Sequence, residues 1–111
     1  MTDADILLRQ LQALANPVRL WVVSKLARDG PLYVSQLARA AGISRPLMKM
    51  HLNKLEGAAL VESRTGAAET GKLANFYSVA PFDLHLTPNS IANAGPPPGA
   101  ADPKSEGDRN G

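Results

Sequence analysis

Two stretches of helical spacing in the middle of the chain are separated by only three residues, Gly42, Ile43 and Ser44. Their apolar residues recur at helical intervals: Leu37, Ala38 and Ala41 before the gap, and Met48, Leu52 and Leu55 after it. Gly42 favours the left-handed conformation that ends a helix, and Ser44 is a good N-cap for the next one. Two helices joined by so short a turn are typical of the helix-turn-helix motif.

Two further helices are expected before this motif. Asn16 and Pro17 end the first and begin the second, because Asn caps helices and Pro is favoured in a first helical turn. The first helix carries an apolar stripe of Leu7, Leu11 and Leu14. In the second helix, the residues expected to face the core are Leu20, Val23 and Ala27, flanked by Val22 and Leu26. Its outward face is expected to carry Trp21, Ser24, Lys25 and Arg28.

A β-hairpin is expected after the motif. Residues 60–64 read as a strand, 65–71 as a flexible loop and 73–79 as the return strand. The fourth helix is expected to end at Gly57, and Ser35 is expected to cap the third. The sequence therefore predicts a mainly α fold with a small β-hairpin, a winged helix-turn-helix.

Length and composition narrow the class of protein. The 111 residues fit one folded domain, expected at 1–94, and the Pro- and Gly-rich residues 95–111 are expected to form a disordered tail. Without cysteine the chain has no disulfide and no thiolate metal site. No apolar run is long enough for a membrane span, and Asp3 and Asp5 do not suit a signal peptide, so we expect a cytoplasmic protein. Without a Gly-rich phosphate loop, we expect neither a cofactor nor an enzyme.

Residues 11–79 resemble the ArsR-type (arsenic-repressor-like) winged-helix regulators. The resemblance rests on three segments in the family's order: LANPVRLWVVSKL, VSQLARAAGIS and SRPLMKMHLNKLEGAALVESR, followed by ANFYSV. It implies a dimeric repressor that releases DNA when a signal binds. Two features depart from the family: the cysteines of its metal sites are absent, and PFDLHLTPNSIANAG stands where a long last helix often completes the dimer. The signal therefore stays unknown.

The predicted partner is a palindromic operator in double-stranded DNA. Six basic residues against three acidic ones lie between residues 39 and 72, which suits a phosphate-contacting face. In a helix-turn-helix the outward N-terminal part of the second helix reads base edges. We expect DNA contacts from the caps, this helix and the wing: Ser35, Ser44, Arg45, Pro46, Leu47, Lys49, Met50, Asn53, Lys54, Arg64 and Lys72. Arg45 is expected to pair with guanine, and Leu47 or Met50 is expected to contact a thymine methyl group. The lysines Lys49 and Lys54 are expected to contact phosphates.

A homodimer interface is expected from the first helix and the segment after the wing. The residues assigned to it are Ile6, Leu7, Leu11, Leu14, Phe82, Leu84 and Leu86. The alternation of the last three predicts a strand with Asp83 and His85 on its solvent side, which disfavours a metal site at those two residues.

Trp21 and His51 leave alternatives open. An exposed Trp21 marks a ligand or partner contact, or else its indole is covered by residues 81–94. His51 lies near the buried face and is expected to be a hydrogen-bonded structural residue.

The alternative function is a winged-helix protein-interaction module that does not bind DNA. The apolar residues Leu47, Met48 and Met50 favour this alternative.

Overall fold

The computed structural model describes residues 2–95. Its elements follow in this order: α1 (Asp3–Leu14), α2 (Pro17–Asp29), β1 (Leu32–Tyr33), α3 (Val34–Ala41), α4 (Arg45–Gly57), β2 (Val61–Ala67), β3 (Leu73–Val79) and α5 (Pro88–Ala92). The predicted mainly helical fold with a β-hairpin is confirmed. The predicted tail boundary falls at the edge of the described residues and stays a prediction, and residues 96–111 lie outside them.

Backbone contacts divide the chain into two compact units. Residues 9–83 form one unit, which holds the helix-turn-helix and the sheet. Of the other unit, the structure describes residues 2–8 and 84–95. No helix within residues 2–95 is long and apolar enough to cross a membrane.

The helix-turn-helix forms as the local sequence chemistry predicts. Gly42 ends α3 in the left-handed conformation at φ 71°, which glycine adopts without steric cost. The N–H of Ile43 then donates to the Ala38 carbonyl at 3.1 Å. Ser44 caps α4, since its Oγ accepts from the Leu47 N–H at 3.2 Å. These bonds fix where α4 begins relative to α3.

Two predicted helix ends differ in the structure. Ser35 does not cap α3, because it lies inside the first turn, and the Gln36 side chain accepts from the Tyr33 N–H instead at 3.0 Å. Gly57 belongs to the last turn of α4 and has no positive φ. The left-handed residue after this helix is Ala59, at φ 60°.

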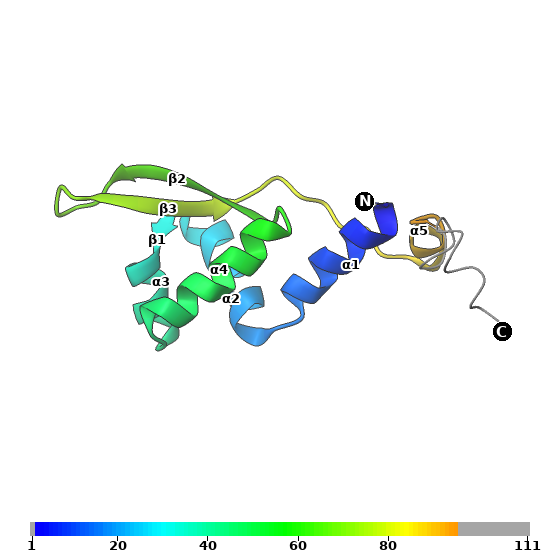
Figure 1. Ribbon diagram of the computed structural model, residues 1–111, viewed down its shortest axis with the longest axis horizontal. Coiled ribbons are helices and arrows are strands. Elements are labelled where there is room, and N and C mark those ends of the chain that lie inside the picture. The colour runs from blue at the N-terminus through cyan, green and yellow to red at the C-terminus, as the bar shows by residue number, and fades with distance from the viewer. Residues whose placement is uncertain (1, 96–111) are drawn as a thin grey trace, which may run out of the picture. The chain divides into compact units, whose positions relative to one another are not determined.

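The sheet has three antiparallel strands in the order β1-β3-β2. The two-residue β1 adds a strand to the predicted hairpin, pairing Leu32 with Tyr77. The predicted loop 65–71 is wrong in extent, because β2 continues to Ala67 and pairs with Leu73. Figure 1 shows the β2–β3 hairpin reaching past α3 and α4. This projecting hairpin is the wing.

The core lies where α2, α3 and α4 pack beneath the sheet. Its largest fully buried side chains are Val22, Leu37, Met48, Leu52, Leu55, Leu60, Val61 and Tyr77. The three predicted inward residues of α4 are all among them. Burying such side chains contributes about 1.5–3 kcal/mol each, so this cluster stabilises the position of α4 strongly.

The predicted inward face of α2 is wrong in part. Val22 and Leu26 are buried and Val23 packs against the core, whereas Leu20 and Ala27 are exposed. α2 carries apolar residues around most of its circumference, so its spacing alone does not select one face.

The predicted strand through Phe82, Leu84 and Leu86 is also wrong. Residues 81–87 have no regular structure, and α5 begins after Thr87. Thr87 caps α5, since its Oγ1 accepts from the Ser90 N–H at 3.0 Å.

Candidate nucleic-acid interface

The two faces of α4 differ sharply. Its inner face is fixed by four buried residues: Met48, His51, Leu52 and Leu55. Its outer face is exposed and carries most of the residues expected to read DNA: Arg45, Pro46, Leu47, Met50, Asn53 and Lys54. Leu47 is 39% exposed, although it is a large apolar side chain. The outer face therefore combines one cation at the helix start with apolar groups available for contact.

Lys49 differs from the rest of the expected set. It is half-buried, and its Nζ donates a hydrogen bond to the hydroxyl of Tyr77 at 2.7 Å. The expected phosphate contact at Lys49 is not tested by this geometry, but its ammonium is already engaged within the protein.

His51 is held in the buried face of α4. Nη1 of Arg19 donates to its Nδ1 at 3.0 Å, which confirms the expected hydrogen-bonded structural histidine. Burial, and then the adjacent Arg19 guanidinium, lowers the pKa of the His51 imidazole. The neutral ring is therefore the form that fits this site.

The wing presents two basic residues. Arg64 lies in β2 opposite Phe76, and Lys72 directly precedes β3. Both are exposed, and the hairpin tip between them is closed by a 2.8 Å bond from the Ala68 N–H to the Lys72 carbonyl. The loop at the wing tip is thus shorter than the sequence suggested and is closed by a hydrogen-bonded turn.

Several basic side chains have no hydrogen bond or ion pair within residues 2–95. They are Arg9, Arg39, Arg45, Lys54, Arg64 and Lys72. By contrast, Lys25 pairs with Asp29 at 2.5 Å. Four of the unpartnered cations belong to the predicted DNA-contact set. A phosphate would meet these cations without first displacing an acidic partner.

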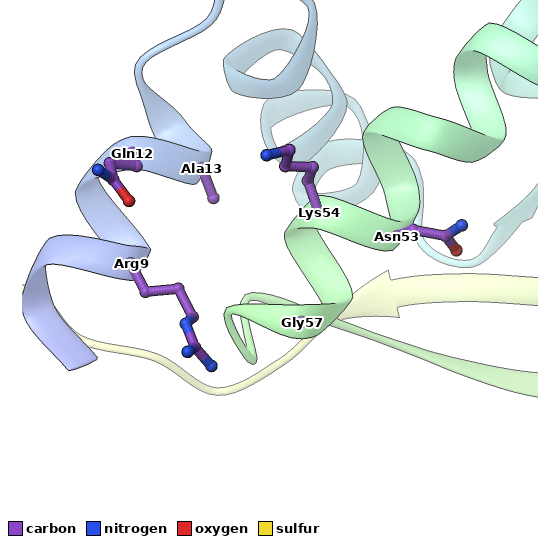
Figure 2. A pocket seen from close by; sticks show the side chains of 6 residues that line it. All are labelled: Arg9, Gln12, Ala13, Asn53, Lys54 and Gly57. Carbon is purple, nitrogen blue, oxygen red and sulfur yellow. The ribbon is translucent and has the colours of Figure 1, made fainter. Parts of the chain in front are cut away.

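Arg9 is a basic residue that the sequence analysis did not assign. It lines a hollow of about 320 Å³ between α1 and α4, together with Gln12, Ala13, Asn53, Lys54 and Gly57. Figure 2 shows Arg9 reaching toward the end of α4 and Lys54 reaching toward α1. Nothing local in the sequence marks this approach, because the two residues are far apart along the chain.

The residues assigned to the dimer interface fall into two groups. Ile6 and Leu86 are 44% and 49% exposed, and Leu7, Leu11 and Leu84 are half-buried. Leu14 and Phe82 instead pack against the core of residues 9–83. The exposed members leave apolar surface for a second chain to cover.

Trp21, which was expected on the outward face of α2, is half-buried and packs against the core. It lines an apolar hollow with Pro17, Val18, Ala40 and Ala41. Asp83 and His85 are both exposed, and residues 2–95 hold no group of three or more potential metal ligands.

Comparison with known proteins agrees with this geometry. A helix-turn-helix domain model matches residues 14–64. The chain is 33% identical over 75 residues to the HTH-type transcriptional regulator MJ0229 of Methanocaldococcus jannaschii, a match covering 68% of this chain and 77% of the relative. It is 37% identical over 65 residues to the nodulation protein NolR of Rhizobium meliloti, covering 59% of this chain but only 52% of NolR.

Two solved structures are similar across most of the described fold. The homodimeric winged helix-turn-helix DNA-binding domain Mb0332 of Mycobacterium bovis, a possible ArsR-family regulator, has a TM-score of 0.58 at 28% identity, covering 79% of this chain and 69% of that chain. The chain belongs to the ArsR family of winged helix-turn-helix transcriptional regulators. The other structure, the transcriptional repressor BigR of Xylella fastidiosa, has a TM-score of 0.58 at 28% identity, and the match covers 71% of this chain and 72% of that chain. The predicted family is thereby confirmed.

Proposed function

We propose that this ArsR-family protein is a sequence-specific, dimeric DNA-binding repressor. The observation that carries the proposal is the outer face of α4, where Arg45, Leu47 and Met50 are exposed while the opposite face is buried in the core. A helix whose inner face is fixed in the core and whose outer face is exposed is suited to insertion into a major groove.

The roles of the exposed residues follow from their chemistry. Arg45 at the start of α4 pairs bidentately with guanine, while Leu47 and Met50 contact thymine methyl groups and Asn53 pairs with adenine. Lys54, Arg64 and Lys72 neutralise phosphates. Ser35, Ser44 and Pro46 lie near the helix N-termini, where backbone N–H groups also suit phosphate.

A twofold dimer presents two α4 helices to successive major grooves of a palindromic operator. The exposed apolar residues of α1 and of the segment after the wing supply its interface, and the similar Mb0332 domain is described as homodimeric. The dimer acts in the cytoplasm and includes no catalytic step. It represses until an unidentified signal weakens DNA binding, as the description of BigR as a repressor supports.

A protein-interaction module without DNA binding is the second candidate. The exposed Leu47 and Met50 favour it, since apolar groups on a helix face also suit a protein partner. The unpartnered cations of α4 and the wing favour DNA.

The test is selection of binding sequences from a pool of random DNA duplexes, followed by fluorescence anisotropy on the selected duplex and a scrambled one. We expect preferential binding that weakens steeply with salt, because neutralised phosphates release counterions. Lys72→Gln should weaken binding, whereas Arg28→Gln, which removes a cation of α2 outside the proposed surface, should not. Equal binding of selected and scrambled DNA would refute sequence specificity, and no binding to either duplex would favour the second candidate.

A further inference from the structure

Tyr77 is a tyrosine whose ring belongs to the core and whose hydroxyl meets a cation. The residue is 0% exposed and lies in β3, the central strand of the sheet. Its hydroxyl accepts from Nζ of Lys49 on α4 at 2.7 Å. A buried phenol hydroxyl needs a hydrogen-bond partner, and here the partner comes from α4, the proposed recognition helix.

The contact is a hydrogen bond rather than a cation–π interaction. Nζ of Lys49 lies 2.7 Å from the Tyr77 hydroxyl oxygen but 5.4 Å from the ring centroid. Since the hydroxyl is at the rim of the ring, these two distances together place the ammonium near the ring plane and not over its face. Hydrogen bonds to a charged donor are stronger than those between neutral groups.

A second contact joins α4 to the same cross-strand position of the sheet. The Ser63 hydroxyl donates to the Glu56 carboxylate at 2.8 Å, and Ser63 pairs directly with Tyr77 across β2 and β3. Glu56 lies seven residues after Lys49, two turns along nearly the same side of α4. The two contacts therefore hold one cross-strand pair of the sheet against one side of the recognition helix.

We propose that Lys49 is a positioning residue, which sets the distance between the recognition helix and the wing through the Tyr77 hydroxyl. The inference rests on the proposed function. Base reading by α4 and phosphate contact by Arg64 and Lys72 succeed together only if the helix and wing match the fixed spacing of the DNA grooves. Lys49 thus acts on binding through the wing, in place of the direct phosphate contact expected from its charge.

The test is a double-mutant cycle with Lys49→Met and Tyr77→Phe, two changes that keep the side-chain shapes while removing the bond. Tyr33→Phe is the matched control, because the Tyr33 hydroxyl has no hydrogen bond within residues 2–95. On a selected duplex, each single variant should bind roughly tenfold more weakly, which corresponds to losing one charged hydrogen bond. The double variant should bind no more weakly than either, and Lys49→Arg should restore part of the loss.

The slope of affinity against salt and the length of the duplex separate positioning from direct contact. We expect both single variants to show the same salt slope as the wild type. On duplexes trimmed of the flanking base pairs that the wing reaches, their affinity should differ little from that of the wild type. A direct phosphate contact would instead lower the slope by about one in Lys49→Met and leave Tyr77→Phe like the wild type. That result would overturn the proposal.

Hydrogen exchange of the free protein gives a readout that needs no DNA. Lys49→Met and Tyr77→Phe should each exchange faster than wild type at the amides of β2 and β3, whereas Tyr33→Phe should not. If the variants exchange faster but the protein binds no selected DNA, the proposed function is refuted, while the role of the Lys49–Tyr77 hydrogen bond in holding the wing is retained. Unchanged exchange in both variants would show that the bond does not hold the wing.

Discussion

Arg19 joins three helices through one guanidinium, and its contact with His51 is the link to the recognition helix. Nη1 donates to Nδ1 of His51 at 3.0 Å, while Nε donates to the Ala13 carbonyl at 2.7 Å. Ala13 is near the end of α1, Arg19 is in α2 and His51 is in α4. Because Nδ1 accepts a hydrogen bond here, the imidazole carries its proton on Nε2 when it is neutral.

The first prediction concerns pH. The pKa of His51 is lowered in the folded protein, first by burial and then by Arg19, from the ordinary value of about 6.5. Between the lowered pKa and 6.5 the unfolded chain binds more protons than the folded one, so the free energy of unfolding rises with pH. The contribution is fully present above pH 6.5 and is lost as the pH falls toward the folded-state pKa. Urea unfolding at a series of pH values measures it.

His51→Gln should flatten this part of the pH profile, since the amide does not titrate. The matched control is His85→Gln at an exposed position, which should retain the slope that comes from His51. A slope that survives in His51→Gln would assign the effect to other groups.

The second prediction compares two glycines. Gly42→Ala should lower the free energy of unfolding by about 1 kcal/mol, because φ is 71° and an L side chain is strained there. Gly57→Ala should raise it by about 0.5–1 kcal/mol, because Gly57 is helical and nothing lies within 4 Å of the added methyl group. Thermal unfolding measures both. Equal effects of the two changes would contradict the assigned turn.

The parts of the fold that could be predicted are those with local chemical causes. Gly42, Ser44 and Asn16 fix helix ends through their own backbone preferences and hydrogen bonds. These helix ends can therefore be predicted without tertiary information. The buried face of α4 was predictable for a related reason, since its apolar residues form one stripe.

The errors arise where several tertiary arrangements suit the same local pattern. α2 is apolar on most sides, and only packing selects Val22 and Leu26 over Leu20. The hydrogen bond from Lys49 to Tyr77 is likewise not apparent from the sequence, because the two residues lie 28 positions apart. The phosphate contact expected from the charge of Lys49 stays a prediction. The hollow that Arg9 and Lys54 both line is likewise formed by residues far apart along the chain. Sequence reasoning thus found the elements of the candidate interface but not the contacts that orient them.

The third prediction concerns base reading. Arg45→Ala should reduce discrimination at one base pair by about 1–3 kcal/mol, since the guanidinium is exposed at the start of α4 and has no partner within residues 2–95. Lys72→Ala should weaken binding to all duplexes and lower the salt slope by about one. Anisotropy on duplexes with single substitutions separates the two effects. Equal losses on selected and scrambled DNA would remove Arg45 from the base-reading role.

The last prediction concerns the dimer. Ile6 and Leu86 are exposed, so changing both to Glu should leave the free energy of unfolding of one chain nearly unchanged. Each side chain that a partner covers contributes about 1.5–3 kcal/mol, and a twofold interface loses both copies, so dimerisation should weaken by several kcal/mol.

Sedimentation at micromolar concentration should therefore find the wild type dimeric and the double variant monomeric. Leu73→Glu is the matched control, because Leu73 is the most exposed of the large apolar residues in the described chain yet lies at the wing, outside the proposed interface. It should remain dimeric. The monomeric variant should still bind a single half-site weakly, because its recognition helix is intact, but lose the tight binding that two linked half-sites give. A wild type that stays monomeric both free and on DNA would refute the dimer.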